Sequence, residues 1–349
     1  MALRKFDSDA TIAVLPVSDQ ARQRLLAVNP GDWHVPRSAV EQWLSPSQAF
    51  FLTGHAAVLI DEGRGALLVT LDARPRQDRW AAFSLLRVAP DLDGEAAEAS
   101  AIALLRAARQ WAFAHDARHL RGPLPFSTWF PYRVLADDRE QGPVGFFGEA
   151  VEPVSYNRWY RAAGFQVTDR YVTMALPEDP TFWETHLTRE AALSARRRDH
   201  FLVRPLSPQD GAALLPVVHG WINAAFADNA YFSPLGQSDF IDRVLGALPA
   251  EAEPIRLAAF DPSGSPFGVL TGHLEGDRGV LKTIAVHPDV RRGRCAMALS
   301  FAFHRMLYER GLTRAWHAQM HECNASARMS AKYARPVRHY VVYGDTLRH

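Results

Sequence analysis

Apolar and polar positions along the first part of the chain predict several strands followed by a long helix. Residues 61–65 have the composition of a tight turn between two strands, which predicts a hairpin. From Ala97 to Ala112, apolar residues return at the 3.6-residue period of a helix that buries one face. The other predicted elements are strands at 11–17, 49–53, 56–61, 64–72 and 80–88 and helices at 18–28 and 36–44.

The second part of the chain repeats this order of predicted elements. Val286-His287-Pro288-Asp289 stands before its long helix, as Val88-Ala89-Pro90-Asp91 stands before the first one. A repeat of this length indicates internal duplication of a whole domain. The predicted elements are strands at 201–205, 255–261, 267–274, 280–286, 315–320 and 337–343 and helices at 208–226, 240–248, 299–307 and 325–331.

The length of 349 residues also suggests two domains. We expect a first domain at 1–178, a linker at 179–200 and a second domain at 201–349. The arginines at 196–198 favour a solvated helix face over a binding patch.

Composition narrows the class of protein. Hydrophobic residues make up 48% of the chain and the net charge is +1, so neither a nucleic acid nor a membrane surface is an expected partner. Two cysteines are too few for a disulfide framework. With no signal peptide and no apolar run of about 20 residues, we expect a cytoplasmic enzyme.

The turn between the strand at 280–286 and the next helix is the strongest candidate for a binding site. The first backbone N–H groups of a helix lack partners and carry partial positive charge, which suits an anion. Arg291, Arg292 and Arg294 add three guanidinium groups there, and Gly293 and Ala296 leave room for close approach. A pyrophosphate would fit this turn, and an ordinary basic surface turn is the alternative.

This strand, V-x-P-x-x-R turn and amphipathic helix resemble the coenzyme A loop of the GNAT superfamily, written R/Q-x-x-G-x-G/A. The resemblance covers 201–349 and, more weakly, 8–176, and is closest to tandem proteins such as mycothiol-synthase-like acyltransferases. It implies an α/β (α+β) fold of two GNAT-like domains, each a mixed, largely antiparallel central sheet flanked by helices. Arg294 stands where the family has a glycine, and Ala331 where many members have a catalytic tyrosine.

The resemblance implies an N-acyltransferase that moves an acyl group, acetyl by preference, from coenzyme A to a small-molecule amine. A backbone N–H between Ile284 and Val286 would polarise the thioester carbonyl. In the family, an asparagine like Asn324 opens the second helix that faces the cofactor. The implied cofactor-binding residues are Ile284, Ala285, Val286, Arg291, Arg292, Gly293, Arg294, Cys295, Ala296 and Asn324.

His321 and Glu322 follow a predicted strand and are the candidate bases, although the sequence favours a plain solvent carboxylate over a base for Glu322. Tyr333 is the candidate acid for the leaving thiolate. Alternation places His317, Gln319 and His321 on one strand face. No metal is expected, because His317 and His321 have no third ligand spaced nearby. Cys295 stands at the helix start, a position that could lower the pKa of its thiol. The favoured alternative is a small loop residue without a chemical role.

In the family, the acceptor lies beside the loop between the first two helices of the domain. Asp228 could hold a cationic amine there, with Tyr231 and Phe232 flanking an apolar part. A capping aspartate and core aromatic residues are the alternative. The matching turn of the first half, at 91–98, carries four carboxylates that would repel a pyrophosphate. We therefore expect a degenerate first domain and a single cofactor site.

Two other functions stay open at this point. An acyl carrier protein could supply the acyl group as an acyl-phosphopantetheine, with the arginines meeting its acidic surface. Alternatively, both halves could have lost catalysis and serve as a binding scaffold. An oxidoreductase is disfavoured, because no G-x-G-x-x-G turn follows a strand.

Overall fold

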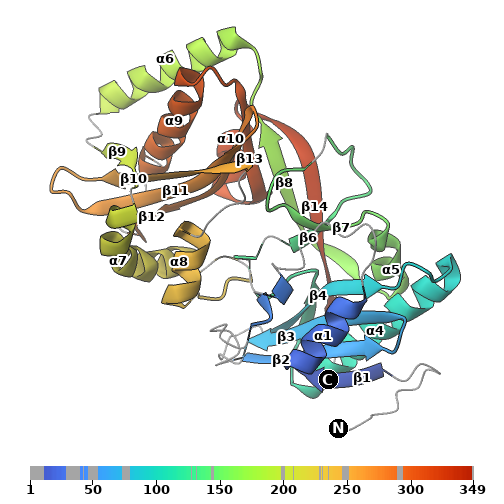
Figure 1. Ribbon diagram of the computed structural model, residues 1–349. Coiled ribbons are helices and arrows are strands. Elements are labelled where there is room, and N and C mark those ends of the chain that lie inside the picture. The colour runs from blue at the N-terminus through green and yellow to red at the C-terminus, as the bar shows by residue number, and fades with distance from the viewer. Residues whose placement is uncertain are drawn as a thin grey trace. The chain divides into compact units, whose positions relative to one another are not determined.

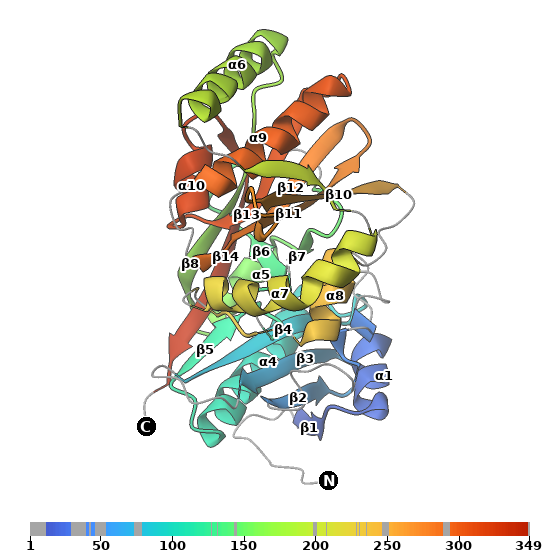
Figure 2. The same ribbon diagram turned by 90° about the vertical axis from the view of Figure 1, so that its left-hand side faces the viewer.

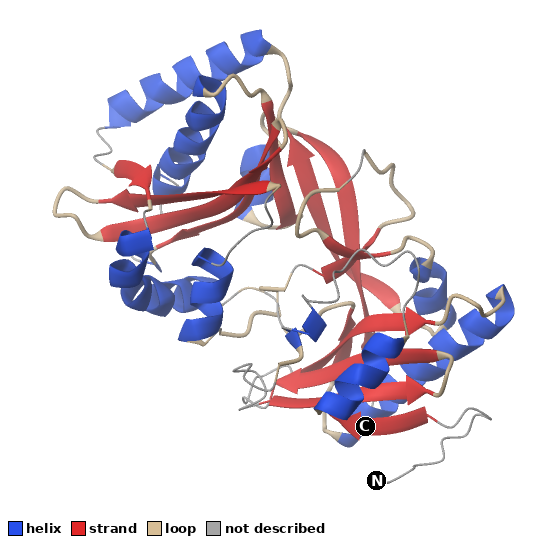
Figure 3. Cartoon of the chain, viewed as in Figure 1, coloured by secondary structure: helices blue, strands red, loops and turns tan. Residues whose placement is uncertain are grey.

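The protein is described by a computed structural model, drawn in Figures 1 and 3. In the part of the chain that it describes, no helix is long and apolar enough to cross a membrane. The described residues are 12–28, 40–41, 43–45, 54–72, 79–126, 128–130, 132–142, 145–197, 201–206, 208–227, 229, 231–234, 236–245, 251–288 and 294–347.

The chain forms two compact units, and each contains a segment from the other half of the sequence. Unit 1 comprises Met1–Gln141, Gly148–Arg170 and His339–His349, and unit 2 comprises Gly142–Phe147 and Tyr171–Arg338. The strand at Gln166–Ala175 therefore begins in unit 1 and ends in unit 2, and the strand at Arg335–Thr346 does the reverse.

Unit 1 is built on a mixed sheet in which β1 to β4 are antiparallel and β5 joins β4 in parallel. The end of β14 pairs with β5 from Tyr343 to Thr346 and closes this sheet. The strands are β1 Ile12–Pro16, β2 Gly54–Asp61, β3 Gly65–Asp72, β4 Trp80–Val88, β5 His119–Gly122, β6 Tyr132–Leu135, β7 Ala150–Glu152 and β8 Gln166–Ala175. The helices are α1 Asp19–Ala27, α4 Gly94–Ala114 and α5 Tyr156–Ala162.

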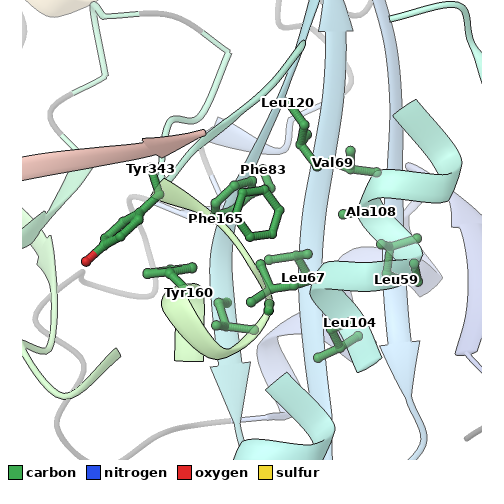
Figure 4. Packing of buried hydrophobic residues seen from close by; sticks show 14 of the residues in the cluster. Leu59, Leu67, Val69, Phe83, Leu104, Ala108, Leu120, Tyr160, Phe165 and Tyr343 are labelled. Atoms are coloured by element: carbon green, nitrogen blue, oxygen red, sulfur yellow. The ribbon is translucent and has the colours of Figure 1, made fainter. Parts of the chain in front are cut away.

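Helices α1 and α4 cover the two faces of this sheet (Figure 2), so both of its faces are buried. Every residue of β4 is buried, as expected for a central strand. Alternate residues of β3, such as Leu67 and Val69, point toward α4 and pack against Leu104 and Ala108 (Figure 4). Burial of these side chains is the main stabilising contribution to unit 1.

Unit 2 has the same architecture. Strands β9 to β12 are antiparallel, β13 joins β12 in parallel, and the end of β8 pairs with β13. The strands are β9 Leu202–Pro205, β10 Ala252–Phe260, β11 Pro266–Glu275, β12 Arg278–Val286, β13 Arg314–His321 and β14 Arg335–Thr346. The helices are α6 Pro180–Arg197, α7 Pro208–Phe226, α8 Gln237–Leu245, α9 Arg294–Glu309 and α10 Ala325–Ser330.

Helix α9 packs on β9 to β12, and α6 packs on α9. The α9 side chains that enter this core, among them Leu299, Phe303 and Leu307, follow the helical period of the sequence. The predicted mixed, largely antiparallel architecture is thus confirmed. The two units share the order of three antiparallel strands, a long helix, a parallel strand, a short helix and a last strand, and unit 1 adds β6 and β7 before its short helix.

The compact units divide the chain differently from the linear boundaries expected from the sequence. Helix α6 fills most of the expected linker and contributes Trp183 to the core of unit 2. The predicted helix at 36–44 and strand at 49–53 fall largely or wholly outside the described residues.

Candidate functional site

The parallel pair β12 and β13 separates partway along its length. Their ladder joins Arg278–Leu281 to Arg314–His317 and goes no further in the described residues, although β12 extends to Val286 and β13 to His321. A β-bulge lies on β12 at the same point, because Leu281 and Thr283 face consecutive residues of β11 and Lys282 is extra. The result is an opening between two strands at the carboxyl edge of the sheet.

The backbone of β12 presents hydrogen-bonding groups to this opening. The His287 N–H donates to the Phe267 carbonyl of β11 at 2.8 Å. Because backbone groups alternate between the two edges of a strand, the N–H groups of Val286 and Ile284 point the other way, toward β13. By the same alternation the Ala285 N–H faces β11, so the predicted donors that face the opening are those of Ile284 and Val286, whose side chains are half-buried.

Helix α9 begins at Arg294, just after this edge, and its first turn is pressed against the sheet. Cys295 is fully buried, and a Cβ at Gly268 of β11 would lie 2.6 Å from its sulfur. Burial raises the pKa of the Cys295 thiol to about 12, so the alternative of a lowered pKa is wrong and the residue is a core thiol. Ala296, next in the helix, is half-buried.

Several predicted residues cannot be placed. Arg291, Arg292, Gly293 and Asp228 lie outside the described residues, and the Arg294 side chain is not described either. Their assigned roles stay predictions.

Tyr333, the candidate acid, lies near the inner end of the opening. Its ring centroid is 6.2 Å from that of His317, the last β13 residue paired with β12. Burial raises the pKa of Tyr333 to about 12, and a hydrogen bond with Ser300 of α9 partly offsets this effect. The hydroxyl therefore keeps its proton at neutral pH.

The candidate bases lie at the outer end of β13. The His321 ring meets Tyr171 edge-on at 5.0 Å, and its Nδ1 accepts the Cys323 N–H at 3.2 Å. In a neutral ring that contact leaves the proton on Nε2, so His321 would donate there rather than accept. Glu322 is half-buried beside it. Asn324 is the N-cap residue of α10, as the sequence suggested, without a side-chain capping bond.

The predicted shared face of His317, Gln319 and His321 is wrong. Between His317 and Met320 the register with β8 slips by one residue, and Gln319 has φ of 53°. One extra residue reverses the alternation, so His317 shares its face with Met320. The Ser330 hydroxyl confirms this, since it lies 2.7 Å from His317 Nδ1 and 3.6 Å from the Met320 sulfur.

The two aromatic residues proposed for the acceptor differ in exposure. Phe232 is 2% exposed and stacks on Phe226 with ring centroids 6.2 Å apart, which favours the core alternative for Phe232. Tyr231 is half-buried with φ of 60°, a backbone conformation uncommon for a residue with a Cβ.

In unit 1 the strands equivalent to β12 and β13 separate at a similar point, with one backbone hydrogen bond at the inner end of the opening. Strand β4 pairs with β5 over three residues, and the Leu124 N–H then donates to the Phe83 carbonyl at 2.8 Å. The equivalent residue of unit 2, Gln319, donates instead to the Thr173 hydroxyl of β8 at 3.1 Å. Asp93 caps α4 by accepting the Ala96 N–H at 2.7 Å, so a carboxylate occupies the helix start.

A buried histidine cluster on the α9 face of unit 2 is absent from the sequence-based predictions. It joins His186 of α6, His304 of α9 and His317 of β13, with Glu190 one helical turn after His186. Burial lowers the pKa of all three rings, that of His317 to about 4, and raises the pKa of Glu190 to about 7. The helical spacing of His186 and Glu190 was the available signal, hidden because 179–200 was expected to be a linker.

No protein-family model and no curated protein sequence matches the chain. Solved structures do match it over most of its length. A tandem GNAT protein from the clavulanic acid biosynthesis pathway is 15% identical, with 97% of this chain and 99% of that chain covered and a TM-score of 0.52. A GCN5-related N-acetyltransferase from Anabaena variabilis is 12% identical, with 97% and 73% covered and a TM-score of 0.55.

The N-myristoyltransferase of Saccharomyces cerevisiae, solved with bound myristoyl-CoA and inhibitors, is 10% identical, with 100% and 83% covered and a TM-score of 0.50. At these identities the comparisons establish the fold, which is that of tandem GNAT proteins. The narrower likeness to mycothiol-synthase-like acyltransferases stays a prediction.

Proposed function

We propose that this chain, with its tandem GNAT fold, is an N-acyltransferase that moves an acyl group from an acyl-CoA to the amine of a small molecule. The observation that carries the proposal is the opening between β12 and β13. It joins the backbone N–H groups of Ile284 and Val286, which have no partner among the described residues, to the start of α9. We expect a single thioester site in unit 2, since the Asp93 carboxylate caps the equivalent helix of unit 1 and would repel a pyrophosphate.

In the proposed complex, the pyrophosphate binds the start of α9 with Arg291 and Arg292, and the pantetheine arm extends along the open edge of β12. We also assign cofactor binding to Asn324, at the start of α10. The thioester carbonyl accepts a backbone N–H of β12, which stabilises the negative charge that develops on its oxygen. The position of the pantetheine arm follows from the direction of strand β12.

The amine nitrogen attacks the thioester carbon after losing a proton, and the carbon–sulfur bond then breaks. We assign proton donation to the leaving thiolate to Tyr333, which lies near the inner end of the opening and keeps its proton at neutral pH. Glu322 and His321 are the candidate proton acceptors. Glu322 fits better, because the Cys323 N–H occupies Nδ1 of His321.

The donor is acetyl-CoA in the simplest form of this proposal, and longer acyl-CoAs are tested beside it. An acyl carrier protein remains the alternative donor. For the acceptor, Asp228 is proposed to hold the amine and Tyr231 to flank its apolar part, whereas Phe232 is buried and is left out.

Calorimetric titration with acetyl-CoA and longer acyl-CoAs tests the proposal. Arg291→Ala and Arg292→Ala should each weaken binding about 10- to 100-fold, the effect of losing a charge-assisted hydrogen bond. The matched control is Arg305→Ala, which removes an exposed arginine of α9 that pairs with Glu309 and lies over the Phe301 ring of the same helix. Its affinity should stay at the wild-type value.

A protein that binds none of these thioesters, while keeping its native circular dichroism, would not be an acyl-CoA enzyme. The carrier-protein donor is then tested with an acyl-phosphopantetheine carrier. Failure with both donors would favour the scaffold, for which the helix start of unit 1, capped by Asp93, is a structural precedent within the same chain.

A further inference from the structure

We propose that His186, Glu190 and His304 form a binding site for a divalent transition metal, Zn²⁺ by preference, inside unit 2. His186 and Glu190 lie four residues apart on α6, so their side chains share one face of the helix. His304 reaches the same point from α9. One nitrogen or oxygen from each of the three residues lies within 4.8 Å of the other two.

The spacing of these atoms suits a metal better than direct hydrogen bonds. His186 Nε2 lies 3.4 Å from His304 Nδ1 and 3.6 Å from Glu190 Oε1. Both separations exceed the usual range for hydrogen bonds, about 2.7–3.2 Å. They are close to the roughly 3.3 Å between two ligands of a tetrahedral zinc ion with bonds of about 2.0–2.1 Å.

The hydrogen bonds that link His304 to His317 and Ser330 leave a free lone pair on His304 Nδ1. The thioether of Met320 can only accept, so the Ser330 hydroxyl donates to it and accepts from His317 Nδ1 at 2.7 Å. With its proton on Nδ1, His317 then accepts at Nε2 from His304 Nε2 at 3.0 Å. His304 therefore offers its other nitrogen to His186 and Glu190, the arrangement in which metal-binding histidines are held by a second partner.

Glu190 supplies a second, independent indication of a ligand. Its carboxylate side chain is only 12% exposed, and its Oε2 is buried without a hydrogen-bond partner among the described residues. A buried carboxylate oxygen left unpaired is costly, and a cation between Glu190 and the two imidazoles would compensate it.

The ligand set indicates which metal fits. Two imidazoles and one carboxylate form a known zinc ligand set that leaves a fourth position for water. Phe182 stacks on the His186 ring, with centroids 5.2 Å apart, and Trp183 meets His304 edge-on. These aromatic side chains shield the cluster. A metal here would join α6 to α9 and thereby stabilise unit 2.

Measuring the metal content of the protein tests this site independently of acyl transfer. The full chain is stripped with a chelator, loaded with Zn²⁺ or Co²⁺ alone, desalted and measured by elemental analysis. We expect one Zn²⁺ per chain, a Co²⁺ spectrum with the intense visible bands of a four-coordinate site, and a higher Tm with Zn²⁺. Substoichiometric metal, or no shift of Tm, would overturn the proposal.

The variants Glu190→Gln and His186→Gln keep side-chain size and should lose the bound metal and the Zn²⁺-dependent rise in Tm. The control is His55→Gln, an exposed histidine of unit 1, which should bind one Zn²⁺ as the wild type does. Both site variants should keep native circular dichroism without metal. Full metal binding by either one would also overturn the proposal, whatever the outcome of the acyl-CoA titrations.

Discussion

At the scale of single residues, the proposed acid makes the clearest prediction. Tyr333→Phe removes only a hydroxyl that lies near the inner end of the β12–β13 opening. It should lower kcat about 100-fold, because the thiolate loses its proton donor, while the KM for acyl-CoA changes little. Steady-state kinetics with a panel of primary amines measures both constants.

Tyr308→Phe is the matched control, since the Tyr308 hydroxyl donates to the exposed Glu184 and lies outside the proposed site. Its kcat should equal that of the wild type. Unchanged kcat in Tyr333→Phe would reduce this residue to a packing role. Glu322→Gln and His321→Asn in the same assay separate the two candidate bases, with the larger fall in kcat expected for Glu322→Gln.

Single residues were also where sequence reasoning was weakest. The period-two pattern of β13 predicted a shared face for His317 and His321, but the bulge at Gln319 reverses the alternation. A bulge of one residue leaves no pattern in an isolated strand, because it depends on the pairing with β8. The contact of His317 with His304 likewise depends on the packing of α9.

At the scale of elements, the close approach of α9 to β11 can be tested by its effect on stability. A Cβ at Gly268 would lie 2.6 Å from the Cys295 sulfur and 3.0 Å from Leu299 Cδ1. Gly268→Ala should therefore lower the free energy of unfolding by about 1–3 kcal/mol, the usual cost of overpacking. It should also weaken acyl-CoA binding, because the start of α9 must shift. Denaturant unfolding and calorimetry measure the two effects.

Gly220→Ala is the control for this substitution. Gly220 lies inside α7, and in the described part of the chain no atom beyond its own stretch of helix lies within 4 Å of its missing Cβ, so alanine should stabilise the protein by about 0.5–1 kcal/mol. If Gly268→Ala were as stable as the wild type, the tight contact between α9 and β11 would not exist in solution.

Most elements could be predicted from the sequence, because each buries one face with its own period. Strand β4 and helix α7 begin and end at the predicted residues. Helix α6 was missed: prolines at 177 and 180 and the arginine run at 196–198 suggested a linker, whereas the burial of Trp183 against α9 stabilises a helix. Such tertiary stabilisation overrides local composition.

At the scale of the whole molecule, duplication explains both what the halves share and how they differ. Each half forms the same sheet, but Leu124 adds a backbone hydrogen bond at the inner end of the opening of unit 1, and Asp93 occupies the start of its long helix. The duplication and the acidic turn could be predicted from the sequence. The Leu124 hydrogen bond could not, because it joins backbone groups of strand β4 and of the chain after β5.

Hydrogen–deuterium exchange with and without saturating acyl-CoA tests the central claim most directly, because it locates the bound thioester on the chain. We predict slower exchange in peptides that contain Ile284–Val286, Arg291–Ala296 and Asn324, and unchanged exchange at 88–98 in unit 1. Protection of residues 88–98, or protection nowhere in unit 2, would contradict a single acyl-thioester site at the end of β12.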